Sequence, residues 1–346
     1  MKDYIKISQR VDEKNIRDIQ ANIERLKAEG GYPEQFFYPT TLQFELTGQC
    51  NLACKHCYNR SGDADRKTLM TPDKWCDLAK EIVRDGGIFQ CIISGGEPLL
   101  LGNSVFDIMD ILHDDGTSFV VITNGFLLTK EKVKRFAKYR FFWFQVSIDG
   151  HCPEIHDAFR GVDGSWGHAV QGALEVSSAG IPLVIASSIT PKSLPYVDKM
   201  AELAYQLGAN SVILGEILPS GRAFSHPELL LSIEQRNYLY AMIDGLNKQY
   251  AGKMVINRSA DLKIQMQRYV IESNSGGIIR PNGDFRLDCM TPFVIGNVLQ
   301  TPLKQIWLEK GINAWHHPKV KAFIDSIHFN DQHGNIPNHV GDDVLL

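Results

Sequence analysis

The chain has 346 residues, of which 44% are hydrophobic and 22% are charged, values that fit a globular protein with one large core. Its formal net charge is -4, which excludes the basic field typical of nucleic-acid-binding proteins. No apolar run is long enough to cross a bilayer, and residues 1–15 lack the apolar core of a signal peptide. We therefore expect a cytoplasmic protein without a nucleic-acid or membrane partner.

The first expected element is a polar amphipathic helix over residues 12–29, followed by a connector with two prolines over 30–41. Six short β-rich runs then occupy 42–47, 89–94, 118–123, 142–148, 183–189 and 211–217. Helix-period stretches alternate with them at 72–85, 104–114, 129–138, 165–179, 194–208 and 232–249. This alternation predicts an α/β fold with a parallel sheet, helices outside it, and a site at the C-terminal ends of the strands.

The alternation stops after residue 250. Residues 276–289 predict a β-hairpin that turns at Pro281–Gly283, and residues 301–311 predict a short helix that ends at Gly311. The last residues are rich in Asn, Asp, His and Gly and predict a mobile tail. The resulting division is an N-terminal helix and connector (1–41), a main domain (42–249), a small α+β annex (250–330) and a tail (331–346).

The segment CNLACKHCY directly follows the first strand and contains Cys50, Cys54 and Cys57. The chain contains seven cysteines. In the reducing compartment expected for this protein, they favour metal binding or catalysis over disulfides. Thiolates are the usual ligands of iron–sulfur clusters, and three ligands to a four-iron cluster leave one iron open. The alternatives are a zinc site with His56 as a fourth ligand, or three unrelated buried thiols.

The CX3CX2C spacing after the first strand resembles the radical S-adenosylmethionine superfamily. The resemblance implies that the three cysteines bind a [4Fe-4S] cluster, whose open iron is chelated by S-adenosylmethionine. It implies reductive cleavage to a 5′-deoxyadenosyl radical that abstracts a substrate hydrogen, with electrons from a reductant such as flavodoxin or ferredoxin. Six strand–helix units imply an open, partial (β/α)6 TIM-like barrel. The family often has an aromatic residue before the third cysteine, and His56 fits.

Further motifs occur at the ends of later strands. The second strand ends in SGGEPLL, similar to the family's GGE motif, so Gly95, Gly96 and Glu97 are expected to meet the methionine amino group. The resemblance also implies cofactor-facing roles for other strand ends. These residues are Ser147 with Asp149 in SIDG, Arg160 in HDAFRG, Ser187 in IASS and Arg222 in LPSGRA. Each of them is also compatible with an ordinary turn or surface role.

Residues 278–307 resemble the SPASM or twitch region of peptide-modifying radical enzymes, which usually carry cysteines for auxiliary clusters. Here only Cys289 is present, and residues 273–275 are Ser-Asn-Ser where an earlier cysteine is expected. One cysteine cannot hold a cluster, so we expect the hairpin without its clusters. Cys289 is either a buried remnant or a hydrogen-atom donor, as in radical epimerases. Cys76 and Cys91 are expected to be small buried hydrophobic residues, and Cys152 has no assigned role.

The resemblance favours modification of a ribosomally made peptide with a leader, through crosslinking or epimerisation. Crosslinking oxidises the substrate, so the apparent lack of auxiliary clusters favours epimerisation. One alternative is an epimerase or dehydratase that acts on a sugar, nucleoside or other small molecule. Another is a metal-binding or regulatory module without catalysis, against which the GGE motif and the polar strand ends count.

Overall fold

The protein is described here from a computed structural model that covers residues 13–32, 35–259, 262–327 and 343–346. Its strands are β1 Thr41–Glu45, β2 Gln90–Ser94, β3 Ser118–Thr123, β4 Phe141–Ser147, β5 Leu183–Ile189, β6 Ser211–Glu216, β7 Val255–Arg258, β8 Gly277–Ile279, β9 Asp284–Arg286, β10 Phe293–Asn297 and β11 Val344–Leu345. Its helices are α2 Glu13–Ala28, α3 Pro72–Arg84, α4 Ser104–Asp114, α5 Lys130–Phe136, α6 Pro153–Arg160, α7 Ser165–Ser178, α8 Val197–Gln206, α9 Ile233–Gln249, α10 Leu262–Ile271, α11 Leu303–Ile306, α12 Ile312–Ala314 and α13 Pro318–Ser326. None of the described helices is long and apolar enough to span a membrane.

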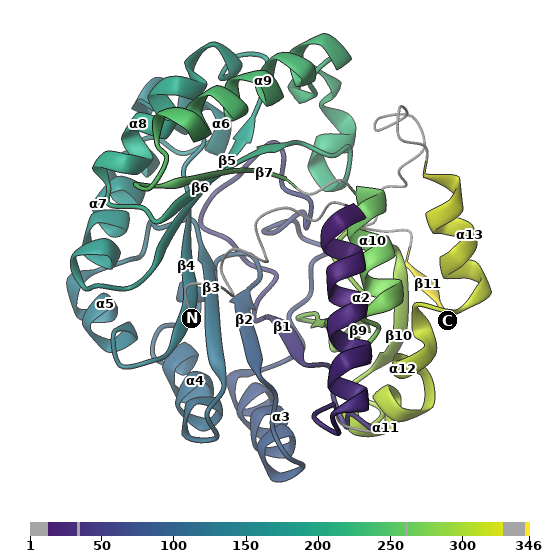
Figure 1. Cartoon of the computed structure of the whole chain (residues 1–346). Coiled ribbons are helices and arrows are strands. Elements are labelled where there is room, and N and C mark those ends of the chain that lie inside the picture. The colour runs from purple at the N-terminus through teal and green to yellow at the C-terminus, as the bar shows by residue number, and fades with distance from the viewer. Residues whose placement is uncertain (1–12, 33–34, 260–261, 328–342) are drawn as a thin grey trace.

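The described strands form one sheet in the order β11-β10-β9-β8-β1-β2-β3-β4-β5-β6-β7. Strands β1 to β7 are parallel and curve into an open arc, with α3 to α9 on its outside (Figure 1). Each loop that follows a strand of the arc therefore lies at the same end of the sheet. This arrangement confirms the expected α/β class with a partial barrel.

The parallel part of the sheet extends beyond the six expected units. Strand β7 lies after residue 250 and pairs in parallel with β6, so the expectation that the alternation stops at 250 was wrong. Its sequence, VINR, is short and ends in polar residues, which hides it from a search for apolar alternation. Helix α6 was also missed, because its eight residues are too few to show a clear helical period.

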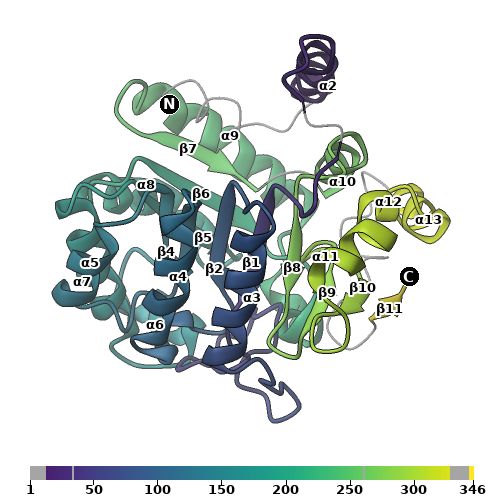
Figure 2. The ribbon, with the colours of Figure 1, turned by 90° about the horizontal axis from the view of Figure 1, so that it is seen from below.

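The C-terminal segment continues the same sheet at its other edge. Strand β8 pairs in parallel with β1, and β8, β9 and β10 form an antiparallel set, so the hairpin expected over 276–289 is confirmed. Helices α11 to α13 lie on the annex side of β8, away from β1 (Figure 2), and α11 contacts β10. The domain boundaries at 41, 249 and 330 stay predictions, although the β1–β8 pairing joins the main domain and the annex into one sheet.

Two expectations for the annex were wrong. The helix expected to end at Gly311 continues through a π-helical turn, Trp307–Gly311, into α12. Gly311 has helical angles, and a Cβ there would overlap the indole ring of Trp307, so this glycine makes room for a side chain. Within the expected tail, residues 344–345 form β11 and pair with β10, while 328–342 lie outside the described residues.

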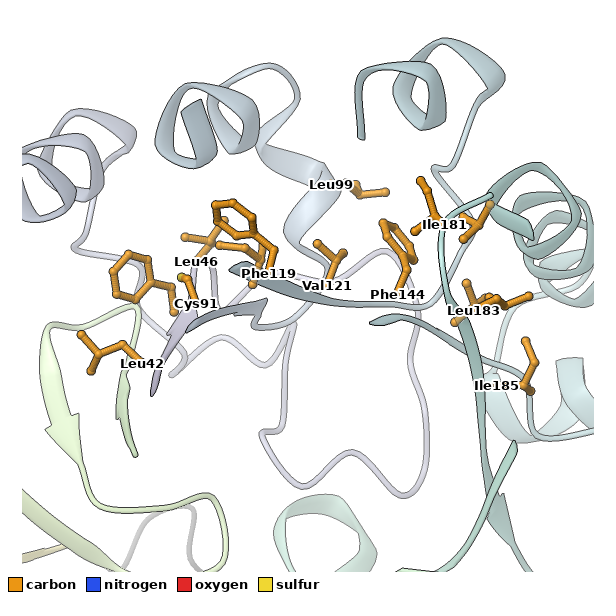
Figure 3. Close-up of a cluster of buried hydrophobic side chains, with 14 of the residues drawn as sticks. Leu42, Leu46, Cys91, Leu99, Phe119, Val121, Phe144, Ile181, Leu183 and Ile185 are labelled. Carbon is orange, nitrogen blue, oxygen red and sulfur yellow. The ribbon is translucent and has the colours of Figure 1, made fainter. Parts of the chain in front are cut away.

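The main core lies between the arc and its outer helices. Strand side chains that point toward the helices include Phe119 and Val121 of β3, Phe144 of β4 and Ile185 of β5, all at most 1% exposed (Figure 3). Cys91 of β2 lies in this layer, fully buried, as expected for a small hydrophobic residue. Burial of this layer fixes which face of each strand points inward, and with it the direction of the loops at the strand ends.

Candidate active site at the ends of the parallel strands

The three cysteines lie in the loop after β1, at the C-terminal end of the sheet. Cys54 is buried, and Cys50 and Cys57 are half-buried. Burial, together with the nearby Cys54, Glu97 and Cys57, raises the pKa of Cys50 to about 11. The three sulfurs therefore lie within electrostatic reach of one another. Thiols this close together resist deprotonation unless a positive charge lies beside them, and iron ions would supply that positive charge.

Each of the three sulfurs accepts a hydrogen bond from the chain itself. The amide of Asn124 approaches Cys50 Sγ at 3.8 Å, and Arg160 Nη1 approaches Cys54 Sγ at 3.7 Å. The backbone N–H of Ser61 donates to Cys57 Sγ at 3.4 Å. Donors to sulfur stabilise thiolate charge and orient the ligands of a metal centre. The sulfurs are thus held by the loop's own backbone at Ser61, by the end of β3 and by the C-terminal end of α6.

Buried polar atoms without partners surround the same loop. Among the described residues they include Asn51 Nδ2, His56 Nδ1 and Ser61 Oγ. Unsatisfied buried polar atoms are rare in proteins and mark positions where a ligand is missing. No set of three or more His, Cys, Asp or Glu side chains in the described residues is arranged to hold a single metal ion. Three thiols, their donors and these free polar atoms fit a sulfur-ligated cluster.

The second strand end packs closely against this loop. Gly96 donates its N–H to the carbonyl of Thr47, and Glu97 donates to that of Gln49. Gly95 has a φ of +131°, and a Cβ on Gly96 would overlap the Gln49 carbonyl oxygen. The two glycines therefore allow β2 to approach the chain that enters the cysteine loop. Their contact with the methionine amino group stays a prediction.

Glu97 is fully buried, and its carboxylate is engaged by the protein. It accepts hydrogen bonds from Thr123 Oγ1 at 2.8 Å, from Asn124 N at 2.9 Å and from Leu99 N at 3.1 Å. Burial raises the pKa of Glu97, and the three hydrogen-bond donors act in the opposite direction and lower it. The side chain thus joins the ends of β2 and β3 and positions Asn124, the amide donor to Cys50. Its predicted contact with an ammonium group stays untested, and the visible role is positioning.

Arg160, on α6, forms a buried ion pair. Its Nε lies 2.5 Å from Asp149 Oδ2, and Asp149 also accepts from Ser188 N at 2.7 Å. Burial alone would raise the pKa of Asp149, but the Arg160 guanidinium lowers it. The carboxylate that Arg160 binds is therefore one from the protein, and through this pair the fourth and fifth strand ends support Cys54.

The two predicted serines lie on neighbouring strands of the arc. Ser187 of β5 is buried and donates from Oγ to the Ile148 carbonyl at 2.5 Å. Ser147 is half-buried at the end of β4 and pairs with Ala186 of β5. Both lie at the same end of the sheet as the cysteine loop, and their cofactor contacts stay predictions.

His56 stacks on Phe159 of α6. The ring centroids are 4.2 Å apart and the ring planes differ by 4°. Burial lowers the pKa of His56 to about 4, so its imidazole is neutral near pH 7. The stack fixes the residue before Cys57 against the helix that carries Arg160. This packing gives a structural reason for an aromatic ring at that position.

The sixth strand end clamps the cysteine loop from outside. Arg222 donates from Nε to the Cys54 carbonyl at 2.8 Å and from Nη1 to the Ser61 carbonyl at 3.1 Å. Its Nη1 is also 2.6 Å from Asp63 Oδ1. Arg222, expected to face the site, therefore holds the backbone of the loop.

Gly221, next to Arg222, allows this clamp to close. Its φ is +60°, and a Cβ would overlap the carbonyl oxygens of Cys57 and Tyr58. We expect Gly221→Ala to lower the free energy of unfolding by about 2 kcal/mol and to reduce iron retention, because the loop must move outward. Gly245→Ala in α9, where a Cβ meets nothing within 4 Å, is the matched control. It should lower neither the free energy of unfolding nor the iron content. Thermal unfolding and iron assays that do not separate the two variants would contradict this.

The sequence analysis missed a polar group beneath the cysteine loop. Tyr58 donates to Glu45 Oε1 at 2.8 Å, and Asn59 donates to Glu45 Oε2 at 3.2 Å. Glu45 is 2% exposed at the end of β1. The available signal was a carboxylate between two large apolar residues, Phe44 and Leu46, because a buried carboxylate needs donors.

Cys289 follows β9 in the annex and is half-buried. Burial and the neighbouring Asp288 carboxylate raise its pKa, and its thiol hydrogen-bonds to that carboxylate. Cys289 also lies within electrostatic reach of Glu45 and Tyr58. The annex thus brings this thiol to the end of β1, beside the cysteine loop. Cys152 is half-buried just before α6.

A large cavity fills the interior of the open arc, with a volume of about 1830 Å³. Inward side chains of the strands line it, among them Gln43, Ile92 and Ile213. It reaches the N-terminal ends of the strands and, on the annex side, Tyr269 and Asp288. A cavity of this size exceeds that of an ordinary small-molecule site and admits a peptide segment.

His156 of α6 makes the site sensitive to acid. It is fully buried and accepts a hydrogen bond from Asp149 N at 3.1 Å, and burial lowers its pKa to about 4. An unfolded chain binds that proton near pH 6.5, so stability is lost as pH falls from about 6.5 to about 4. Between pH 7 and 5 we expect this histidine to remove about 2 kcal/mol of unfolding free energy.

Chemical denaturation at both pH values checks this expectation. His156→Gln should flatten the dependence on pH, and His316→Gln, at an exposed position, should leave it unchanged. An unaltered dependence in the His156 variant would refute the assignment.

Several known proteins are similar to this chain in sequence or in fold. Residues 44–204 match the radical SAM superfamily. The AdoMet-dependent heme synthase of Methanosarcina barkeri is 27% identical over 288 residues, 78% of this chain and 82% of that enzyme. The mycofactocin maturase MftC of Mycolicibacterium smegmatis is 34% identical over 206 residues, 58% of this chain; the matched region is about half (51%) of that maturase. Streptococcus suis SuiB bound to its precursor peptide SuiA shares the fold, with a TM-score of 0.64 and 14% identity over 91% of this chain and 72% of SuiB.

Proposed function

Because this chain carries a radical SAM domain, we propose that Cys50, Cys54 and Cys57 hold a [4Fe-4S] cluster and that the enzyme abstracts hydrogen from a ribosomally made peptide. The observation that carries this proposal is a loop of three thiols, each with its own hydrogen-bond donor, at the end of an open barrel. When bound, the cluster and S-adenosylmethionine supply a 5′-deoxyadenosyl radical.

The residues of the chain act by positioning. Asn124, Arg160 and the Ser61 N–H stabilise charge on the three sulfurs, and Glu97 holds Asn124 in place. Gly95 and Gly96 let β2 pack against the chain that enters the cysteine loop, and we place the methionine moiety of the cofactor beside them. We place the substrate in the cavity of the arc, which is lined by Gln43, Ile92 and Ile213 on strands that lead toward the cysteine loop. A one-electron carrier such as flavodoxin or ferredoxin is the proposed reductant.

The peptide substrate rests on two supports. The maturase relatives include a 34% identical mycofactocin maturase, and SuiB shares the fold in a complex with its precursor peptide. The cavity volume admits several residues of extended chain. The heme synthase relative, which aligns over 78% of this chain, favours the second candidate, a small-molecule substrate. A leader that directs the peptide to the barrel belongs to the first candidate.

Among peptide modifications we propose epimerisation, with Cys289 as the hydrogen-atom donor. The thiol lies on the annex side, next to the end of β1. Donation of a hydrogen atom from its S–H quenches the substrate carbon radical and leaves a thiyl radical on Cys289. One electron from the proposed reductant and one proton then restore the thiol, so the substrate is not oxidised overall. A crosslink would require the removal of electrons through an auxiliary cluster. Among its described residues the annex has one cysteine, which is too few ligands for such a cluster.

Product analysis in deuterated water separates these reactions. The chain is incubated with S-adenosylmethionine, reductant and candidate peptides, chosen from short reading frames found beside its gene. Epimerisation should exchange a hydrogen for a deuterium, and a crosslink should remove two hydrogens. A porphyrin, sugar or nucleoside product without any peptide change would favour the second candidate.

Replacement of Cys289 gives a direct test of the donor. Cys289→Ala should still form 5′-deoxyadenosine when peptide is added, yet lose at least about 90% of the epimerised product, because the carbon radical lacks its donor. Cys152→Ala, which removes another half-buried thiol, is the control and should keep the product. Unchanged product from the Cys289 variant would remove this residue from the mechanism and leave the cluster assignment intact.

A further inference from the structure

A seam joins the cysteine-bearing region to the annex. The backbone N–H groups of Leu69 and Met70 donate to the Pro281 carbonyl, at 2.7 and 2.9 Å. This contact holds the segment that follows the cysteines against the turn of the annex hairpin. It brings Arg66, from the first segment, within electrostatic reach of Arg280, from the hairpin.

Both arginines have donors that the described protein does not satisfy. Arg280 is 4% exposed, and its Nη1 lies 2.6 Å from Asp343 Oδ2, but its Nη2 is buried without a partner. Arg66 Nε is likewise buried without a partner. Arg286, 2% exposed, adds a third positive charge within electrostatic reach of Arg280.

Buried guanidinium donors without acceptors destabilise the folded protein unless an anion accepts their hydrogen bonds. A buried N–H group without an acceptor destabilises the folded state, and more so when it carries charge. Burial and the neighbouring Arg280 charge both lower the pKa of Arg66, the direction expected where positive charge is incompletely balanced. Guanidinium groups present planar N–H forks that match the oxygens of phosphate and carboxylate.

We propose that Arg66 and Arg280 together bind one small oxyanion, which bridges the segment after the cysteines and the C-terminal hairpin. The anion occupies the unsatisfied face of Arg280, opposite the side that Asp343 holds. It is a phosphate or a small carboxylate. Bound there, it stabilises the seam that supports the cysteine loop and the last strand of the annex.

Thermal unfolding of the reconstituted full chain tests the site without any substrate. Potassium phosphate, acetate and chloride are compared at equal ionic strength and pH. We expect phosphate to raise the midpoint by about 3 °C over chloride, because a ligand that binds only the folded state stabilises it. An equal response to acetate would assign a carboxylate ligand, and a smaller one would assign phosphate.

Two variants separate specific binding from a general salt effect. Arg66→Gln should remove the response to phosphate while the Arg280–Asp343 pair remains to keep the fold. Arg84→Gln, whose side chain is 70% exposed, is the control and should respond like the wild type. Broadening of the phosphate resonance in ³¹P NMR should follow the same order. The proposal is overturned if neither anion exceeds chloride in the wild type, or if Arg66→Gln keeps the full response.

Discussion

Replacement of Cys54 with alanine is expected to remove the iron and all cleavage of S-adenosylmethionine. Cys54 is the most buried of the three loop cysteines, and its sulfur is the one that contacts Arg160. With two thiols left, a cubane cluster has too few protein ligands to persist, and the Arg160 side chain loses its sulfur partner. Iron content should fall from about four atoms per chain to background, and formation of 5′-deoxyadenosine should fall by about 1000-fold or more.

Cys76→Ala provides the matched control for this change. Cys76 is half-buried on α3, where its thiol packs against the core. This variant should keep the iron and the activity, at a small cost in stability. A Cys54 variant that remains brown and active would contradict the ligand assignment. Bound zinc in anaerobically prepared wild type would do the same.

Replacement of Glu97 with alanine is expected to have the second-largest effect. The change leaves the buried donors of Thr123 and Leu99, and the N–H of Asn124, without their acceptor. Buried donors without acceptors cost about 1–3 kcal/mol each, so the free energy of unfolding should fall by about 4 kcal/mol. The amide of Asn124 also loses its anchor beside Cys50, and iron retention should fall with it.

Glu97→Gln distinguishes the charge from the shape. Glutamine keeps the volume and one carbonyl acceptor, so it should lose about half as much stability, because its amide must face one of the donors. Glu131→Ala, at an exposed position in the first turn of α5, should change neither the unfolding midpoint nor the iron content. A Glu97→Ala variant with wild-type stability and iron content would refute the positioning role.

The sequence contained enough information to predict the strands that carry the site. Runs such as SFVVIT and LVIASSI are apolar, bounded by turn residues and placed between helical periods, and β3 and β5 match them residue for residue. The order of the loops at one end of the sheet follows from parallel topology alone. The proximity of Cys50 to the ends of β2 and β3 was therefore predictable without coordinates.

Tertiary pairing determined the features that sequence reasoning did not find. Strand β7 is a strand because its four residues pair with β6, and β11 forms because β10 offers an open edge. Gly311 reads locally as a helix end, yet it accommodates the ring of Trp307. Local propensity cannot register contacts between residues so far apart or packing of one side chain over another.

Two site residues illustrate the same limit. The GGE motif predicted Glu97 at this end of the sheet, but its burial among three donors is visible only in three dimensions. Cys289 had no sequence signal for its position. Only the pairing of β8 with β1 brings the annex close enough for its thiol to reach Glu45 and Tyr58.

The amount of 5′-deoxyadenosine formed tests the central claim most directly. The anaerobically reconstituted chain is mixed with S-adenosylmethionine and dithionite, and the products are separated by chromatography. Reductive cleavage at a cluster held by the cysteine loop predicts 5′-deoxyadenosine in the wild type and none in the Cys54 variant. A wild type that carries its full iron but forms no 5′-deoxyadenosine, with or without a peptide, would contradict the account and leave a metal-binding module.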